Sequence, residues 1–263
     1  MRAGRAIGTP TWTDLSITSE QTAEFYRAVF GWDLIEAGEG MGGYRLIKAD
    51  GTLVGGMTDV TRMDPEMPSP IVWDVFLAVD DADARVARAV EHGGRVLLPP
   101  VDIGSTARHA LIEDCSGARV GLWQAGELPG YDFTMAPGTP VWCELMASNY
   151  DSAVEFYRDV FDFDASVMSD GSDGFRYATN GEGDAAVCGI FDAAGILGSE
   201  DKPYWRVYFA VQNIDAAIEA IIASGGAVLD GPTDSPFGRS ATVADPEGAT
   251  FQINESPDPD ARA

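Results

Sequence analysis

The chain has 263 residues, 45% hydrophobic and 10% aromatic, which is enough to bury the core of one large domain or of two ordinary ones. Its 42 acidic and 17 basic residues give a net charge of −25, which repels phosphate backbones and anionic lipids, so we expect no nucleic-acid or membrane partner. No apolar run approaches the roughly 20 residues that span a bilayer, and the first residues lack a secretion signal's apolar stretch. We therefore expect a cytoplasmic location.

The predicted elements of the N-terminal half form two runs of the same order. Alternation of apolar and polar residues predicts a strand at 11–17, and Thr18–Gln21 resembles a capping box that begins a helix at 20–30. Gly31 is the expected stop of this helix. The remaining elements of the half are strands at 44–49 and 53–57, a strand at 73–79, a helix at 81–92, and strands at 94–100, 107–114 and 118–123.

The C-terminal half repeats the same order of elements. "EFYRAVFGW" at 24–32 returns as "EFYRDVFDF" at 155–163, and "DCSGA" at 114–118 returns as "DPEGA" at 245–249. The sequence therefore predicts an α+β protein of four βαβββ units in two domains. Their expected bounds are a first domain at 1–128, a Pro- and Gly-containing linker at 129–139, a second domain at 140–255 and a flexible tail at 256–263.

The predicted strands have two distinct faces, because successive side chains of a strand alternate. In the first strand Leu15 and Ile17 suit packing under a helix, while Trp12, Asp14 and Ser16 lie on the other face. The corresponding faces of other strands carry further aromatic rings with single charged residues. Curved sheets would close such faces around a cavity lined by rings and a few polar groups, as in many small-molecule sites. The alternative is ordinary sheet or domain packing, since aromatic stripes are commonly core.

These motifs, in this order and duplicated, resemble the vicinal oxygen chelate superfamily, which includes glyoxalase I, extradiol dioxygenases and bleomycin-resistance proteins. The resemblance covers nearly the whole chain and implies two domains of paired βαβββ units whose curved mixed sheets each enclose a cavity. It also implies a divalent metal ion held by residues of the first and last strands of each unit. By alignment those positions are Trp12, Gly55, Asp74 and Gly121 in the first domain and Trp142, Cys188, Arg206 and Gln252 in the second.

Neither of these sets suits a metal ion, since a divalent site needs several converging imidazole, carboxylate or thiolate donors. A shift of two residues along a strand would bring Asp14 beside Asp74, or Glu144 beside Gln252, and the donor set would still be thin. We therefore predict no metal site and no cofactor.

The remaining reactive residues give no recognisable active site. Of the two histidines, His92 is expected at a helix end, and His109 lacks a recognisable partner on its strand. Cys115, Cys143 and Cys188 are far apart and predict neither a disulfide framework nor a thiolate zinc site. We expect Tyr26 and Tyr157 of the repeated motif to be packing residues. Activity as a glyoxalase I or an extradiol dioxygenase is not expected.

Three functions remain open. The preferred one is metal-independent binding of a small aromatic or hydrophobic molecule, with cationic ligands favoured by the aromatic faces and the acidic surroundings. The candidate ligand-binding residues are Trp12, Asp14, Asp74, Phe76, Trp123, Trp142, Glu144, Met146, Arg206, Tyr208 and Gln252, with Glu144 and Arg206 as a candidate ion pair.

The second function is a metal-free enzyme, such as a hydroxylase, isomerase or cyclase accessory in secondary metabolism, in which Asp14 or Asp74 would be the acid or base. The third is a structural or interaction protein whose cavities are filled by its own side chains. The sequence leaves open the ligand's identity, turnover, and whether the chain forms a homodimer.

Overall fold

The computed structural model describes residues 5–38, 41–63, 69–131, 134–172, 174–198 and 201–255. The predicted tail at 256–263 lies outside the described residues, as does part of the predicted linker.

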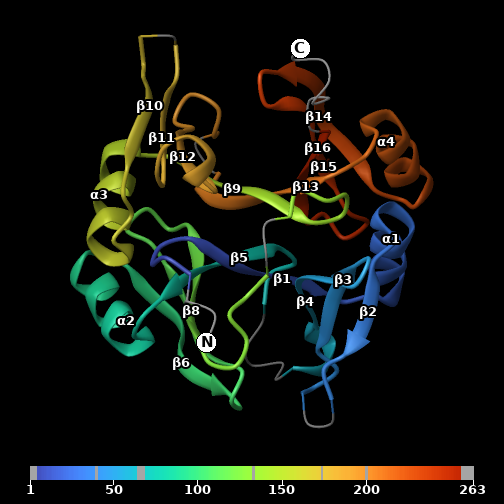
Figure 1. The fold of residues 1–263 in the computed structure, drawn as a ribbon, viewed down its shortest axis with the longest axis horizontal. Coiled ribbons are helices and arrows are strands. Elements are labelled where there is room, and N and C mark those ends of the chain that lie inside the picture. Colours follow the sequence, from blue (N-terminus) through green and yellow to red (C-terminus); the bar gives the residue numbers. More distant parts are fainter. Residues whose placement is uncertain are drawn as a thin grey trace. The chain divides into compact units, whose positions relative to one another are not determined.

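The order of elements confirms the predicted α+β class of four βαβββ units (Figure 1). The N-terminal half comprises β1 (Pro10–Ile17), α1 (Glu20–Phe30), β2 (Asp33–Glu36), β3 (Arg45–Ala49), β4 (Thr52–Asp59), a 3₁₀ helix (Val60–Arg62), β5 (Trp73–Val79), α2 (Ala82–Glu91), β6 (Arg95–Ile103), β7 (Ala107–Glu113) and β8 (Arg119–Ala125). The C-terminal half comprises β9 (Pro140–Ala147), α3 (Tyr150–Phe161), β10 (Ser166–Asp170), β11 (Arg176–Thr179), a 3₁₀ helix (Gly183–Ala185), β12 (Cys188–Asp192), β13 (Tyr204–Ala210), α4 (Ile214–Ala223), β14 (Ala227–Ser235), β15 (Gly238–Ala244) and β16 (Thr250–Glu255).

Each half of the chain forms one eight-stranded mixed sheet. The strand orders are β2-β3-β4-β1-β5-β8-β7-β6 and β10-β11-β12-β9-β13-β16-β15-β14. Parallel pairs join the first and fourth strands of a unit, as in β1 with β4 and β9 with β12. The two units of a half thus share one sheet.

The first helix spans the predicted residues, Glu20–Phe30, but its N-cap is the residue after Thr18, the first residue of the predicted capping box. Ser19 is its N-cap, and the side chain of Ser19 accepts a hydrogen bond from the backbone N–H of Gln21. Gly31 ends the helix as expected, because its φ of 67° lies in the left-handed region that glycine adopts without strain.

The chain divides into two compact units that do not follow the duplication. The first unit contains residues up to Trp12, Asp74–Gly130 and Trp142–Arg206, and in it α2 packs against α3. The second unit contains Thr13–Trp73, Tyr131–Val141 and residues from Val207 onwards, and in it α1 packs against α4. Each unit therefore takes one helix from each half, and the domain bounds drawn from the repeat stay a prediction.

The core of each unit is built around the tyrosine of the repeated "EFYR" motif. In the second unit the Tyr26 hydroxyl donates to Asp245 Oδ2 at 3.0 Å and accepts from Trp73 Nε1 at 3.0 Å.

The first unit has the same arrangement. The Tyr157 hydroxyl donates to Asp114 Oδ2 at 3.1 Å and accepts from Trp205 Nε1 at 2.7 Å. Both tyrosines are fully buried, so each hydroxyl satisfies buried polar groups of the core.

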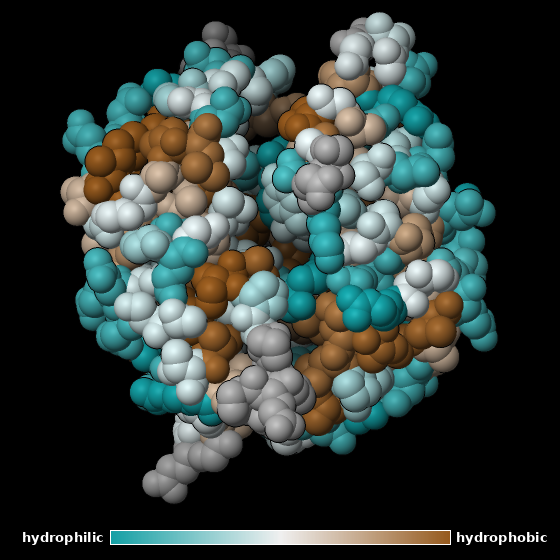
Figure 2. Space-filling model, turned by 180° about the vertical axis from the view of Figure 1, so that it is seen from behind, coloured by the Kyte–Doolittle hydropathy of each residue, from teal (hydrophilic) through white to brown (hydrophobic). Residues whose placement is uncertain are grey.

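The surface of the molecule is largely hydrophilic on the face drawn in Figure 2, with separate apolar patches, in keeping with the charge of −25. Within the described ranges, none of the helices has the length and apolar character needed to cross a membrane.

Candidate functional site

Four residues of the C-terminal sheet form a continuous hydrogen-bond network in the first unit. Three of them were predicted as ligand-binding residues, and the fourth is a tyrosine that was not. Trp142 Nε1 donates to the Tyr177 hydroxyl at 2.9 Å, and this hydroxyl donates to Glu144 Oε1 at 2.7 Å. The other carboxylate oxygen, Glu144 Oε2, accepts from Arg206 Nε at 2.8 Å and also from its Nη2. We call these four residues the Glu144 network; they confirm the predicted Glu144–Arg206 ion pair.

The members of the Glu144 network differ in exposure. Glu144 is only 5% exposed, and a buried carboxylate is tolerated when a charged donor pairs with it. Arg206 and Trp142 are only partly buried. The network therefore combines a buried, ion-paired carboxylate with a guanidinium and an indole that solvent still reaches.

A glycine makes room for the tyrosine of the network. Gly189 of β12 pairs with Glu144 of β9, and a Cβ on Gly189 would lie 2.3 Å from the Tyr177 hydroxyl oxygen. Because real Cβ atoms do not approach so closely, any larger residue here would displace the Tyr177 ring. Tyr177 was not among the residues predicted for the site; the glycine in "VCGIF" was the available signal.

The N-terminal sheet repeats this arrangement in the second unit. Gly56 pairs with Asp14, and a Cβ on Gly56 would lie 1.7 Å from the Tyr44 hydroxyl oxygen. Asp14 accepts hydrogen bonds from the Tyr44 hydroxyl at 2.5 Å and from Thr58 Oγ1 at 2.9 Å. Tyr44 and Thr58 were not foreseen either. The carboxylate, tyrosine and glycine thus recur as a duplicated constellation.

Asp74 is paired with Arg119, which was not among the residues predicted for the site. Arg119 donates from Nε to Asp74 Oδ1 at 3.1 Å and from Nη2 to Oδ2 at 2.8 Å. This two-point geometry is the strong form of an arginine–carboxylate pair. Arg119 thus balances the charge of Asp74, one of the two carboxylates predicted as a candidate acid or base.

The aromatic residues predicted for the N-terminal half pack on one another. The rings of Trp12 and Trp123 stack with centroids 5.0 Å apart, and Phe76 meets Trp123 edge-on at 6.2 Å. Trp12, Trp123 and Phe76 are 1%, 3% and 7% exposed. The ring of His109 stacks on Phe76 at 6.1 Å, and burial lowers the pKa of this imidazole below its usual value. These rings behave as core.

The other predicted residues lie in different surroundings. Met146 is buried in the first unit. Tyr208 and Gln252 are register partners on β13 and β16 of the second unit, where Gln252 Nε2 donates to Thr242 Oγ1 at 2.8 Å. Tyr208 is half-buried and Gln252 buried. The residues predicted for the C-terminal half are therefore divided between the two units.

The residues present do not fit the divalent ion that the fold resemblance implies. Glu144 is held by Arg206, Asp74 is held by Arg119, and a metal ion at either carboxylate would lie beside a permanent positive charge. Asp14 already accepts two hydroxyl donors. Across the part of the chain that the structure describes, no three His, Cys, Asp or Glu side chains are grouped to hold a metal ion.

Comparison with known proteins gives clear sequence relatives. The chain is 38% identical over 252 residues to the "Putative glyoxylase CFP32" of Mycobacterium tuberculosis (strain CDC 1551 / Oshkosh), covering 94% of each chain. It is 33% identical over 262 residues to the "Anthracycline biosynthesis protein DnrV" of Streptomyces peucetius, covering 95% of this chain and 94% of that protein.

Solved structures show the same fold at low sequence identity. The Mn(II)-bound glyoxalase from Novosphingobium aromaticivorans aligns with a TM-score of 0.62 at 16% identity, over 95% of this chain and 82% of that one. The 2,3-dioxygenase LapB from Pseudomonas sp. KL28 aligns with a TM-score of 0.64 at 15% identity, over 98% and 96%. The family profile matches residues 18–122 and 139–253, and the chain therefore belongs to the Glyoxalase/Bleomycin resistance protein/Dioxygenase superfamily.

Proposed function

We propose that this protein binds a small, flat, aromatic or hydrophobic molecule without a metal ion, and that the Glu144 network forms the centre of the binding site. The carboxylates at the positions expected to bind a metal ion are instead bound by arginine and tyrosine side chains. Such groups orient a ligand through hydrogen bonds and shape.

The observation that carries the proposal is the different state of two equivalent tryptophans. Trp12 and Trp142 occupy corresponding positions of β1 and β9, yet Trp12 is 1% exposed and stacked on Trp123, whereas Trp142 is only partly buried. The indole N–H of Trp142 is engaged by Tyr177, which fixes the ring while solvent still reaches it. An oriented, accessible indole suits stacking with a flat ligand.

The chemistry of the network suggests which polar groups the ligand carries. Glu144 is an acceptor held in place by Arg206 and Tyr177, and Arg206 is a partly exposed donor. Phenolic hydroxyl and carbonyl groups on a fused-ring compound would complement this pair. The relatives named for anthracycline biosynthesis favour a ligand from secondary metabolism of this fused-ring kind.

A structural role is a second candidate, limited to the aromatic face of the N-terminal sheet. The stacked and buried Trp12, Trp123 and Phe76 favour it, because these rings already contact one another. The flat aromatic ligand would then bind at the Glu144 network alone and not at the corresponding face of the N-terminal sheet.

The test is a fluorescence titration of the full chain with 1,8-dihydroxyanthraquinone, before and after EDTA treatment. We expect saturable quenching that EDTA leaves unchanged. Trp142→Ala should raise the Kd roughly two- to thirtyfold, the equivalent of one aromatic contact of about 0.5–2 kcal/mol. Trp12→Phe, the matched variant at the equivalent position, should leave the Kd unchanged. Loss of binding after EDTA, or an unchanged Kd for Trp142→Ala, contradicts the proposal.

A further inference from the structure

A groove of about 620 Å³ lies in the first unit, and none of the four residues of the Glu144 network lines it. It runs between α3 and the outer strands β10 and β11. Its apolar walls are formed by Tyr150, Val154, Phe163, Ala165, Val167 and Ala178. Five charged side chains, three acidic and two basic, complete the lining. Nothing in the proposed function uses this groove.

The duplication provides an internal comparison for the groove, since strand register identifies equivalent positions. Asp14 pairs with Gly56 and Glu144 pairs with Gly189, so these two pairs correspond. Following the next ladder, Gly56 pairs with Leu46 and Gly189 with Thr179. Leu46 and Thr179 are therefore equivalent positions. The residues that precede them, Arg45 in the N-terminal half and Ala178 in the C-terminal half, are equivalent as well.

One ladder further out, the same comparison reaches the edge strands. Arg45 pairs with Glu36 of β2, and Ala178 pairs with Val167 of β10. An ion-paired arginine and glutamate in the N-terminal half are therefore replaced by alanine and valine in the C-terminal half.

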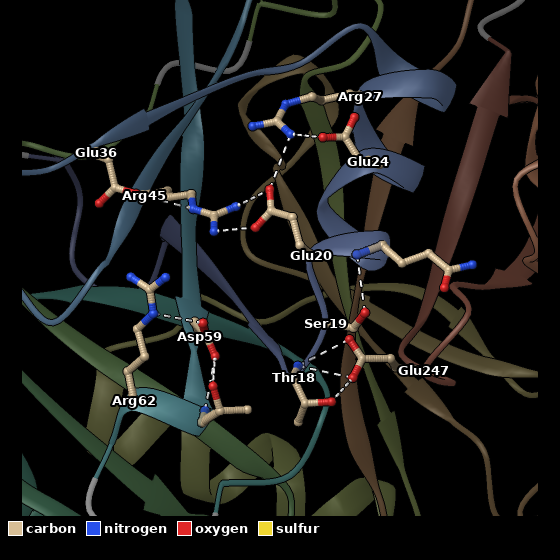
Figure 3. Close-up of polar contacts among 12 residues, drawn as sticks. Thr18, Ser19, Glu20, Glu24, Arg27, Glu36, Arg45, Asp59, Arg62 and Glu247 are labelled. Atoms are coloured by element: carbon tan, nitrogen blue, oxygen red, sulfur yellow. Dashed lines mark hydrogen bonds and ion pairs between the residues drawn. The ribbon is translucent and has the colours of Figure 1, made fainter.

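In the N-terminal half these charged side chains occupy the space between the helix and the strands, as Figure 3 shows. Arg45 donates to both carboxylate oxygens of Glu20 on α1, one of them at 3.0 Å, and its Nε lies 3.6 Å from Glu36. Its side chain is only 8% exposed. The guanidinium thus lies buried between α1 and the outer strands.

In the C-terminal half smaller side chains leave this space open. Besides Ala178, the wall positions Phe163 and Ala165 correspond to Trp32 and Leu34 of the first repeat, while Val154 replaces a smaller alanine. The basic residue stands instead at Arg176, which pairs with Asp151 of α3 and is 36% exposed. Its guanidinium lies over the ring of Tyr150, 4.2 Å from the ring centroid, at the wall of the groove.

Charge and shape together indicate what such a groove would bind. Three carboxylates and two guanidiniums line the groove. Asp151 pairs with Arg176, and Glu155 lies 4.0 Å from Arg158. These pairs leave Asp164 as the carboxylate in excess, within a chain of net charge −25. Val167 is 64% exposed although it lies on an edge strand, where a polar residue such as Glu36 is usual. An apolar floor with an acidic rim suits a flat hydrophobic cation.

We propose that this groove is a second small-molecule site, specific for flat, fused-ring cations. The ring system would lie against the apolar wall, and its positive charge would meet the carboxylates of the rim. The site is independent of the Glu144 network and can be tested separately from it.

The test uses proflavine, a fused three-ring cation, in an equilibrium fluorescence titration of the full chain, with the anion 1-anilinonaphthalene-8-sulfonate as comparator. We expect saturable binding of proflavine and none of the anion at equal concentration. The double variant Val167→Glu/Ala178→Arg rebuilds the charged pair of the N-terminal half in the groove and should weaken proflavine binding at least tenfold. Trp142→Ala should leave proflavine binding unchanged.

A single variant covers the case in which the double variant misfolds. Val167→Lys changes an exposed side chain and places a positive charge at the groove, so it should also weaken proflavine binding while the far-ultraviolet circular dichroism stays that of the parent. Unchanged binding in Val167→Lys, equal binding of the anion, or no saturable proflavine binding by the parent chain overturns the proposal.

Discussion

The hydroxyl of Tyr157 forms hydrogen bonds with two buried polar groups of the core, the Oδ2 of Asp114 and the indole N–H of Trp205. It donates to Asp114 and accepts from Trp205, and Tyr157 itself has no exposed surface. Burial, together with the nearby Asp114 charge, raises the pKa of Tyr157 well above its usual value, so the hydroxyl keeps its proton and remains a donor. The repeated tyrosine is thus a structural residue, as its place on the helix predicted.

At the residue scale we predict that Tyr157→Phe destabilises the protein by about 1–3 kcal/mol, because Asp114 and the Trp205 indole N–H lose a buried partner. The midpoint of urea unfolding measures this loss. Tyr204→Phe, at a half-buried tyrosine of β13, is the matched control and should change the midpoint little. An equal midpoint for the parent and Tyr157→Phe would show that the hydroxyl contributes nothing.

The first helix is anchored through its N-terminus to a turn of the C-terminal half within the second unit. Glu247 of the "DPEGA" turn accepts from the Thr18 backbone N–H at 3.0 and 3.2 Å and from the Thr18 hydroxyl (Figure 3). Glu247 also accepts from Thr22 Oγ1 at 2.6 Å. A carboxylate at a helix N-terminus also interacts favourably with the helix dipole. The "DPEGA" turn therefore holds the N-terminus of α1, the helix that carries the first "EFYR" motif.

At the element scale we predict that Glu247→Ala destabilises the protein by about 1–2 kcal/mol, through lost charged hydrogen bonds and lost capping. Hydrogen exchange should also quicken in the first turn of α1. The control is Glu219→Ala, an exposed glutamate of α4 without such contacts, which should leave both the unfolding midpoint and the exchange unchanged. Protection of the α1 amides equal to that of the parent would contradict the anchoring role.

On the scale of the whole molecule, each compact unit depends on both halves of the chain. In the second unit Tyr26 and Trp32 of the N-terminal half pack with Phe209 and Phe251 of the C-terminal half. In the first unit Arg85 of α2 donates to the backbone carbonyl of Val160 at 2.8 Å. The duplicated sequence therefore does not by itself identify the parts that fold alone.

We predict that residues 1–131, expressed alone, do not form the native cores as a monomer, because Phe209 and Phe251, which pack with Tyr26 and Trp32, are missing. Size-exclusion chromatography and thermal unfolding of this fragment, alone and co-expressed with 132–263, measure the effect. Co-expression should restore a cooperative transition and a one-to-one complex. A cooperative, monomeric fold of 1–131 alone would support the domain bounds drawn from the repeat.

The sequence alone determined the local elements and the family. Alternation placed most of the strands and their two faces, although the edge strands β2 and β10 were not predicted. The "EFYR" repeat revealed the duplication, and the single charges among aromatic residues identified Glu144 and Arg206 as neighbours. These properties follow from short-range periodicity and from motifs, which one sequence displays directly.

Only the tertiary structure decided which partners the site residues have. Tyr177 lies on β11 and Tyr44 directly precedes β3, so both are distant in sequence from the carboxylates that they contact. Their positions depend on a strand register that brings each ring over a glycine. The exposure of Trp142 and the burial of Trp12 likewise follow from what packs over each ring. The physical reason is that pairing, burial and open space arise from contacts between distant segments, and equivalent positions of a repeated sequence can therefore acquire different environments.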